Sequence, residues 1–489
     1  MAVTIAVEGR GALDADSRSL LTVRLEEAVR RTRASGRETL AAVTVAAAPS
    51  TDPSAVAFAS RRPHEPCFCF EQPERGRSAL ATLGSVLALE AHGPDRFERV
   101  AAAWRALSAE AVAGPAPVTS RGGLAPGAPA GSGPVAVGGF AFAPDGGSSP
   151  QWSSFAPASL TVPEVALARR GDEVLLTLAA LAAPDDTPEQ LREQVERRLA
   201  ELSARPLPLL DPAPAGRTRI VSSMPPEHYV SAVGRAVERI AAGELEKVVL
   251  AREVEVHAPV PHDPAGVFGV LREAFPGCYV FCVARGDAAF VAASPELLVR
   301  REGQRASTVA LAGSARRSAD PAVDDHLGEQ LLRSAKDREE QAIVARRIER
   351  TLRAHAVWVA AAPEPALARM ANIQHLATPI RAQLADPIGA IDLAGALHPT
   401  PAVGGEPFER AAELIPALEG MDRGWYAGPV GWTDAAEDGE FCVALRCALL
   451  HGGVGRCYAG VGVVRDSDPA AELAETEVKL QALLPVLAA

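Results

Sequence analysis

Residues 458–479 constrain the fold of this chain more than any other stretch. They read YAGVGVVRDSDPAAELAETEVK. The small and β-branched residues with two interspersed glycines predict a strand, and Asp468 followed by Pro469 predicts the N-cap and first position of a helix. The fold therefore has to bring a strand that contains glycines directly to the start of a helix.

The predicted helix carries a charged face and an apolar face. Glu472, Glu475 and Lys479 are spaced i, i+3 and i+7, which places them on one side at about 100° per residue. A second stripe is apolar and is expected to face a core: Leu473, Leu480 and Leu484. Two explanations fit the charged face. It is a solvated Glu–Lys surface, or it gathers two carboxylates and an ammonium at a site.

Composition excludes several classes of partner. The chain has 489 residues, of which 48% are hydrophobic and 22% charged, so a large core is expected. A net charge of −12 argues against nucleic acid or an anionic membrane as the main partner. The N-terminus lacks the pattern of a secretory signal, and no apolar run reaches the length of a membrane span. The seven cysteines lack zinc or redox spacing, so we expect a cytoplasmic protein with reduced thiols.

The order of predicted elements favours an α+β fold, with large antiparallel sheets wrapped by helices. Helices are expected near residues 21–33, 94–113 and 187–204, and strands near residues 39–47, 135–142, 160–169 and 173–181. Pro- and Gly-rich segments at 114–134 and 206–216 are expected to be surface loops or linkers.

Two residues of the second half are candidates for acid–base chemistry. Lys247 begins the apolar strand KVVLA. Its ammonium either extends to solvent at a sheet edge or points into a cleft, where burial would depress the lysine pKa and allow it to act as a base. Glu296 follows a predicted strand and Pro295, so a rigid turn fixes its direction. Its alternative role is that of a helix-start carboxylate.

A second predicted helix repeats the acidic spacing of the first. Asp337 and Glu340 lie three residues apart after Ser334, as Glu472 and Glu475 do in the C-terminal helix. Magnesium takes oxygen ligands, keeps several waters and uses few carboxylates. Two such helices facing each other could bind Mg²⁺, although acidic pairs at this spacing are also common on ordinary helices.

Groups for an anionic substrate are present as well. Arg446 lies within an apolar strand, where an unpaired guanidinium is costly, and Tyr426 and Lys479 add further donors. Gly460 and Gly462 allow close approach of a ligand to the backbone. His375, in the stretch QHLATP, is either a buried histidine that donates to a carbonyl or a catalytic group.

The motifs together resemble the chorismate-utilising enzymes, and among them the isochorismate synthases of the menaquinone type. Their order and spacing match across residues 222–485, and GGFAF at 138–142 resembles the N-terminal part of the longer members. The matching strings are KVVLAR at 247–252, ASPELLVR at 293–300, LAGSARR at 311–317, SAKDREE at 334–340, QHLATP at 374–379, HPTPAVGG at 398–405, RGWYAGPVGW at 423–432, GEFCVALRCA at 439–448 and YAGVGVVRDSDPAAELAETEVK at 458–479.

The resemblance implies one chorismate-utilising fold over residues 1–489, built from two antiparallel sheets packed together with helices outside. Residues 217–489 would form the catalytic core, and residues 1–216 a less distinctive N-terminal part with the loop 114–134. It also implies a small-molecule substrate, chorismate, and Mg²⁺ as cofactor. The chain would act as a monomer or homodimer, without nucleic acid or membrane.

The resemblance also assigns the site residues. Glu340 and Glu475 would bind the metal, with Asp337 and Glu472 as water-mediated or alternate ligands. The ion would hold the ring carboxylate of chorismate. The substrate would be bound by the remaining positions: Arg446 and Tyr426 at the enolpyruvyl carboxylate, Lys479 with Gly460 and Gly462 at the ring carboxylate, and Gly313, Ser314, His375 and Thr400 along the pocket wall.

Two residues separate the branches of the family. Members that use ammonia have glutamine where this chain has Lys247, so Lys247 would activate water for attack at C2 while Glu296 protonates the departing C4 hydroxyl. Aminodeoxychorismate synthases place a nucleophilic lysine at the position of Ala312, which disfavours that branch. A salicylate synthase, which shares Lys247 and Glu296 and then eliminates pyruvate, is the alternative enzyme. A binding protein that retains the pocket is the non-enzymatic one.

The chain departs from the family at one position near the metal residues. The family usually has Glu-His where this chain has Glu340-Gln341. Any orienting hydrogen bond from that histidine would then come from Gln341 or water, and we expect altered metal affinity without loss of activity. The product would serve menaquinone synthesis or, alternatively, a catechol siderophore.

Overall fold

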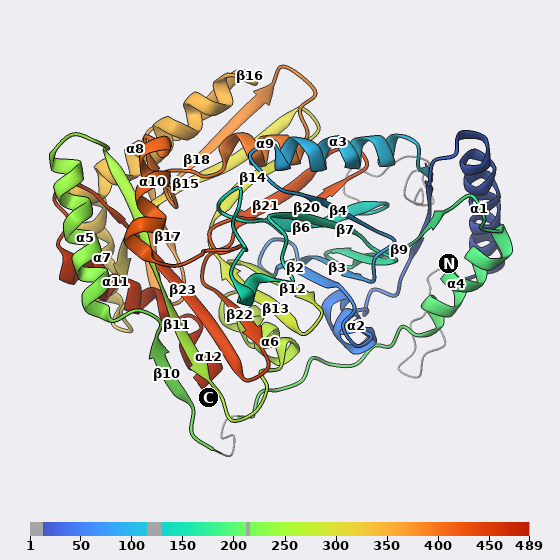
Figure 1. The fold of residues 1–489 in the computed structure, drawn as a ribbon, viewed down its shortest axis with the longest axis horizontal. Coiled ribbons are helices and arrows are strands. Elements are labelled where there is room, and N and C mark those ends of the chain that lie inside the picture. Colours follow the sequence, from blue (N-terminus) through green and yellow to red (C-terminus); the bar gives the residue numbers. More distant parts are fainter. Residues whose placement is uncertain (1–12, 115–129, 212–215, 489) are drawn as a thin grey trace.

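The computed structural model describes residues 13–114, 130–211 and 216–488. Most of the predicted loop 114–134 therefore lies outside the described residues, as does the N-terminal start of the chain. The elements form two β-sheets with helices around them (Figure 1). In the described part, neighbouring strands pair antiparallel except β1 with β5, which are parallel.

The larger sheet has 13 strands and spans the long dimension of the molecule in Figure 1. Its order is β10 (Arg219–Ser222), β11 (Lys247–His257), β23 (Val454–Val463), β22 (Cys447–His451), β13 (Ala288–Ser294), β12 (Tyr279–Arg285), β2 (Cys67–Gln72), β3 (Ser78–Leu83), β8 (Val165–Arg170), β9 (Glu173–Ala182), β1 (Thr39–Ala46) and β5 (Val112–Ala113), with β19 (Gly405–Glu406) beside β11.

The smaller sheet has ten strands. Its order is β16 (Ala356–Ala361), β18 (Ile373–Leu384), β15 (Arg305–Arg316), β14 (Leu297–Glu302), β21 (Gly439–Val443), β20 (Pro429–Asp434), β6 (Val135–Phe140), β7 (Ala158–Val162) and β4 (Leu87–Ala91), with β17 (Ala366–Arg369) beside β18. Both sheets combine strands from before and after residue 216, joined at the β12–β2 and β20–β6 ladders.

Aromatic side chains fill the space between the sheets. Phe290 of the larger sheet packs against its neighbour Phe281 and against Trp152 and Phe155, which lie on the segment between β6 and β7. Tyr279 Oη donates to Glu440 Oε1 at 2.7 Å and so joins β12 to β21 across the interface. Burial of each large apolar side chain contributes about 1.5–3 kcal/mol, so this layer is a main source of stability.

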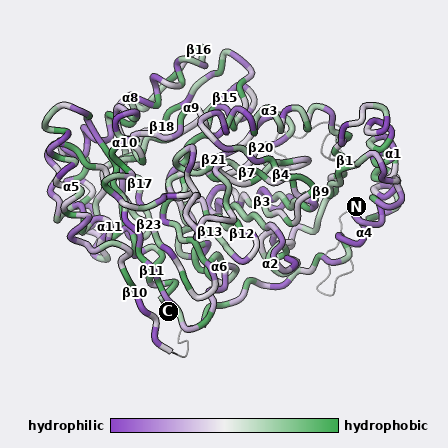
Figure 2. Tube along the Cα trace, in the orientation of Figure 1, coloured by the Kyte–Doolittle hydropathy of each residue, from purple (hydrophilic) through white to green (hydrophobic). Residues whose placement is uncertain are grey.

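Helices cover the outer faces of both sheets. The strands of the larger sheet alternate, as in β12, where Val280, Cys282 and Ala284 turn away from the inter-sheet layer into a second core. That core is covered by α1 (Ala15–Ser35), α2 (Pro53–Ser60), α4 (Pro188–Ala200) and α6 (Pro264–Ala274). On the smaller sheet, α3 (Arg96–Ala109) stacks Phe97 on Phe140 of β6, and α9 (Ala390–Leu397) lies beside α3. Hydropathy follows this layering: the strands are mostly apolar and the outer helices are mixed (Figure 2).

The other helices gather at the end of the molecule drawn at the left of Figure 1. There α5 (Pro226–Ala241) packs on α11 (Pro469–Leu480), and α10 (Phe408–Glu419) packs on β11. Helix α8 (Ala335–Arg353) follows α7 (Pro321–Arg333) and packs on β15, and α12 (Leu484–Ala488) ends the described chain. This end holds the motif SAKDREE at the start of α8 and residues 458–479 on β23 and α11.

Most predicted elements are confirmed, and two are wrong. Arg446, expected within an apolar strand, lies between β21 and β22, which belong to different sheets. The expected strand at 160–169 is two strands, β7 and β8, which belong to different sheets. Pro163 lies at the break, where it cannot donate to a β-ladder. The helix expected at 94–113 ends at Ala109, before β5. All seven cysteines are unpaired and buried, as expected. None of the helices in the described ranges is long and apolar enough to cross a membrane.

Candidate active site

A buried cavity lies where α8 and α11 meet the ends of β11, β15 and β23. Its free space is only about 50 Å³. About 10–15 Å³ of such space holds one water, so the cavity has room for a few water molecules. Eleven predicted site residues line it: Glu296, Gly313, Ser314, Glu340, His375, Tyr426, Arg446, Gly460, Gly462, Glu475 and Lys479.

The α11 segment forms as its sequence predicts. Asp468 is the N-cap and its side chain accepts from Ala471 N at 2.8 Å, while Pro469 occupies the first turn. Leu480 is buried, and Leu473 and Leu484 pack against the cores. The charged face points inward, because Glu472 is only 1% exposed. The solvated alternative for this face is therefore wrong.

Lys247 lies at the first position of β11 and is fully buried. Its Nζ forms an ion pair with Glu340 Oε1 at 2.8 Å. The pair is made possible by Gly462 on the neighbouring strand β23, where a Cβ would come within 2.7 Å of Lys247 Cε and would overlap Glu340 Oε1. The lysine therefore points into the protein and does not extend to solvent at the sheet edge.

Glu296 follows β13 and is also buried. Burial raises its pKa to about 8, although Lys247, Arg446 and Lys479 act in the opposite direction. Its backbone is held by two hydrogen bonds: its N–H donates to Ser294 Oγ at 3.3 Å, and its carbonyl accepts from Val443 N at 3.0 Å. At neutral pH, Glu296 is therefore a protonated carboxyl on a fixed turn.

Arg446 supplies a half-buried cation that lacks a carboxylate partner in the described part of the chain. Its Nη2 donates to His375 Nε2 at 3.0 Å, and His375 Nδ1 lies 3.1 Å from the carbonyl of Gly313. Burial, followed by the charge of Arg446, lowers the pKa of His375 to about 3, so the imidazole is neutral. An unpaired guanidinium facing a cavity is a strong site for an anion.

Tyr426 and the β23 glycines form the wall beside Arg446. Burial raises the pKa of Tyr426, which keeps its hydroxyl protonated. The tyrosine stacks on Tyr458 with ring centroids 5.2 Å apart. A Cβ at Gly460 would come within 2.7 Å of Tyr426 Oη, so glycine is needed for this close approach.

Glu475 is held by groups on two elements. It pairs with Lys479 one turn further along α11 at 2.8 Å, and Ser314 Oγ of β15 donates to it at 2.5 Å. Lys479 Nζ also donates to the carbonyl of Gly460 at 2.9 Å. Burial alone would raise the pKa of Glu475, but Lys479 and Ser314 outweigh burial and leave it below the usual value.

A third pair was not predicted. Lys336 Nζ lies 2.7 Å from Glu472 Oε1, and this lysine was not among the expected site residues. The signal was present, since Lys336 directly precedes Asp337 in the SAKDREE motif. Burial raises the pKa of both Glu472 and Asp337, as expected for carboxylates that share a confined space.

Three of the four predicted metal ligands have lysine partners in this structure. Among the described residues, no group of three or more His, Cys, Asp or Glu side chains could hold a metal ion as it stands. The donors are nevertheless carboxylate oxygens, the kind that Mg²⁺ prefers. They fit a cation chemically, and each lysine contacts only one oxygen of its carboxylate: Lys247 with Glu340, Lys336 with Glu472 and Lys479 with Glu475.

The remaining predicted residues support the cavity from behind. Thr400 does not line it, but its Oγ1 accepts from Ala402 N at 3.3 Å, and Ala402 and Val403 are wall residues. Gln341 Nε2 donates to Thr378 Oγ1 of β18 at 2.6 Å, beside Glu340 in the sequence. Apolar wall positions such as Leu311 and Tyr458 were not predicted, because strand residues of this kind do not differ from core residues in sequence.

Comparison with known proteins gives consistent matches. A family model described as "Chorismate binding enzyme" matches residues 25–488. The salicylate biosynthesis isochorismate synthase of Pseudomonas aeruginosa is 38% identical over 464 residues, covering 95% of this chain and 93% of that protein. Isochorismate synthase MenF of Bacillus subtilis is 34% identical over 355 residues, covering 73% and 75%.

A solved structure is also similar. The menaquinone-specific isochorismate synthase MenF from Escherichia coli has a TM-score of 0.75 and 28% identity, covering 96% of this chain and all of that one. The match extends across both sheets, because it includes nearly the whole described chain.

Proposed function

This chain belongs to the chorismate-binding enzyme family, and from that premise we propose that it is an isochorismate synthase. The reaction adds water at C2 of chorismate and removes the C4 hydroxyl. The observation that carries the proposal is that Glu296 lines the cavity as a protonated carboxyl, while the buried amine of Lys247 pairs with Glu340 of the same cavity wall.

The two residues have complementary roles in acid–base catalysis. Glu296 holds a proton at neutral pH and donates it to the C4 hydroxyl as that group leaves. Lys247, once its amine has released its own proton, accepts the proton of the attacking water, so that the hydroxyl forms at C2 as the double bonds rearrange. The overall reaction consumes one water and releases one water. Ala312, which lines the same cavity, offers no amine nucleophile.

The substrate is a dianion, and the site offers two groups of donors for it. Arg446 and Tyr426 bind the enolpyruvyl carboxylate, because Arg446 has unused N–H groups and the tyrosine hydroxyl remains protonated. Lys479 and the β23 backbone at Gly460 and Gly462 border the ring carboxylate.

We assign Mg²⁺ to the carboxylates of α8 and α11. Glu340 and Glu475 would hold it, with Asp337 and Glu472 in support. When bound, the ion supplies positive charge to the ring carboxylate of the substrate. Because Glu340 is also the partner of Lys247, the ion and this lysine compete for one carboxylate.

The two halves of the chain have different roles in this proposal. We assign catalysis to residues 217–489, while residues before 217 complete both sheets and part of the inter-sheet core. The names of the relatives given above refer to the synthesis of salicylate and of menaquinone. We propose that the product here supplies menaquinone or siderophore synthesis.

Incubation with chorismate and Mg²⁺, followed by chromatography, tests the function directly. Isochorismate is the expected product, and its formation should require added Mg²⁺. Release of fluorescent salicylate and pyruvate as the first products would contradict the proposal in favour of a salicylate synthase. An unchanged chorismate peak would contradict both.

A further inference from the structure

We propose that His375 is a positioning residue that orients Arg446 and acts on the substrate only through it. The inference rests on the proposed function, in which Arg446 binds a substrate carboxylate. Both ring nitrogens of His375 are hydrogen-bonded to protein groups. Nδ1 contacts the carbonyl of Gly313, and Nε2 contacts Arg446.

The hydrogen bonds identify the tautomer. The Gly313 carbonyl can only accept, so His375 Nδ1 carries the proton. Nε2 then has a lone pair, and the guanidinium of Arg446, which can only donate, fills it. The imidazole therefore has no free donor or acceptor for the substrate. The low pKa of His375 agrees with this neutral form.

Gly313 provides the fixed end of this chain of contacts. The β15–β18 ladder shifts register between Ala312 and Ser314, and Gly313 has a φ of 69°, which favours glycine. Asp337 of α8 also closes the space beside it, because a Cβ would come within 2.9 Å of Asp337 Cβ. The bulge turns the Gly313 carbonyl to His375 and holds it there.

Arg446 is the end that needs positioning. Its backbone has a φ of 48°, in the left-handed region that costs a residue with a Cβ about 1–3 kcal/mol. Its guanidinium lacks an Asp or Glu partner in the described part of the chain, although a carboxylate usually fixes the plane of a buried arginine. The His375 contact is thus the side-chain hydrogen bond that sets its direction while leaving other N–H groups for an anion.

Two substitutions separate this role from a purely structural one. In His375→Gln, the amide oxygen reaches the position of Nε2 and can still accept from Arg446. In His375→Asn, the shorter amide reaches only the position of Nδ1 and keeps the Gly313 contact. We expect chorismate to bind His375→Asn about 10-fold more weakly and His375→Gln within about threefold of the unchanged protein, by calorimetry without turnover, since tenfold corresponds to one lost hydrogen bond.

Kinetics and a control complete the test. The loss in His375→Asn should appear mainly in KM, and it should disappear in an Arg446→Ala background, because the two residues act in series. His262→Gln, at a half-buried histidine away from the cavity, should leave both constants unchanged. Equal binding by the Gln and Asn variants, a loss confined to kcat, or additive effects with Arg446→Ala would overturn the proposal.

A readout without substrate distinguishes failure of this inference from failure of the function. Nitrogen-15 NMR of histidine-labelled protein should show His375 as the neutral Nδ1–H tautomer from pH 5 to 8, with its Nε2 signal shifted by Arg446→Ala. An Nε2–H tautomer, or no shift, would sink the inference. If the tautomer and shift are seen but the protein neither binds nor converts chorismate, the proposed function fails while the orientation of Arg446 stands.

Discussion

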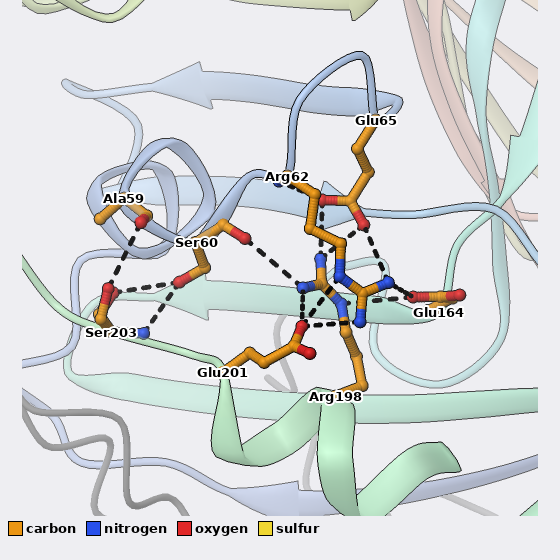
Figure 3. A network of polar contacts seen from close by, with 8 residues as sticks. All are labelled: Ala59, Ser60, Arg62, Glu65, Glu164, Arg198, Glu201 and Ser203. Atoms are coloured by element: carbon orange, nitrogen blue, oxygen red, sulfur yellow. Dashed lines mark hydrogen bonds and ion pairs between the residues drawn. The ribbon is translucent and has the colours of Figure 1, made fainter.

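Two groups of ion pairs in this protein, each with buried members, are built from different cations. The arginine cluster (Arg62, Glu65, Glu164, Arg198 and Glu201) lies between α4 and the segment after α2, and is drawn in Figure 3. The lysine pairs (Lys247–Glu340, Lys336–Glu472 and Lys479–Glu475) surround the candidate active site. Both groups neutralise carboxylates inside the fold.

In the arginine cluster, Arg198 forms ion pairs with three glutamates. Arg198 is only 3% exposed, and its Nη2 donates to both oxygens of Glu65 at 2.8 Å. The same guanidinium contacts Glu164 at 3.2 Å and Glu201 at 3.0 Å, while Ser60 and Ser203 exchange hydrogen bonds beside it (Figure 3). A planar fork with several fixed partners cannot release one of them without losing the others.

The lysine pairs are single contacts. Each ammonium contacts one carboxylate oxygen, so it behaves as a point charge that another cation or an anion can replace. Lysine can also lose its proton where a ligand alters its surroundings, whereas arginine does not. In these two groups, an arginine holds several carboxylates that lie far from the candidate site, whereas each lysine at the site holds one carboxylate.

The largest effect is expected from Lys247→Met, which keeps the side-chain length and removes the amine. Isochorismate formation should fall about 10²–10⁴-fold, the usual contribution of a general base. Lys247→Arg should be equally inactive, because a guanidinium does not accept a proton at working pH. The measurement is kcat by chromatography. Activity near that of the unchanged protein in the arginine variant would erase the distinction between the two groups.

Removal of the arginine at the centre of the cluster should act on stability instead. Arg198→Met leaves Glu65 and Glu164 buried without their main partner, which costs about 3–5 kcal/mol of unfolding free energy. The midpoint in a urea titration should fall, with kcat at low temperature nearly unchanged. Arg198→Lys, as the matched control, should recover only part of the loss. Lost turnover in folded Arg198→Met would contradict the division.

The pH profile gives a third, smaller effect. The pKa of Glu296 is raised from 4.5 to about 8, so the acid form is present below pH 8 and is lost above it. Turnover should decline above about pH 8, by about tenfold per unit at most. The sign for folding is the same: the folded protein holds this proton from pH 4.5 to 8, so stability from this group falls as pH rises through that range.

A Glu296→Gln variant checks the assignment. Its residual turnover should be low and should lack the alkaline decline, since the titrating carboxyl is gone. A decline with the same midpoint in that variant would transfer the effect to another group of the site. The arginine cluster offers the contrast, because Arg198→Lys should leave the profile of turnover against pH unchanged.

The smallest effect is expected at Gln341. Gln341→Leu removes the hydrogen bond to Thr378 and frees the start of α8 beside Glu340, so the Mg²⁺ concentration for half-maximal activity should rise about 10-fold. Gln341→His should restore part of it. Magnesium titration of activity is the measurement, and an unchanged midpoint in Gln341→Leu would show that Glu340 is held by Lys247 alone.

Sequence patterns predicted single helices and strands better than the contacts between residues that are distant in the chain. The α11 segment followed from Asp468, Pro469 and its apolar spacing, because capping and periodicity are local properties. The ion pair between Lys247 and Glu340 joins residues far apart in the chain, and only sheet order and the packing of α8 bring them together. Family resemblance supplied that long-range information for the site residues.

Sequence reasoning failed where one short segment contributes a strand to each of the two sheets. The stretch around Pro163 looked like one strand, yet it ends one sheet and begins the other. Propensity cannot show this, because both halves are apolar and β-favouring. The Arg198 cluster was missed for a similar reason: a charged residue on a polar helix is usually solvated, and only the fold shows that this one is covered.

The β12–β2 and β20–β6 ladders, which join strands from before and after residue 216, limit how this chain can change in evolution. All the candidate chemistry lies after residue 216, but a gene for that half alone would encode β12 without β2 and β20 without β6. Both would be open edges in the middle of sheets, ready to pair with other chains. Evolution could therefore vary the early half, but could not delete it or give it to another protein separately.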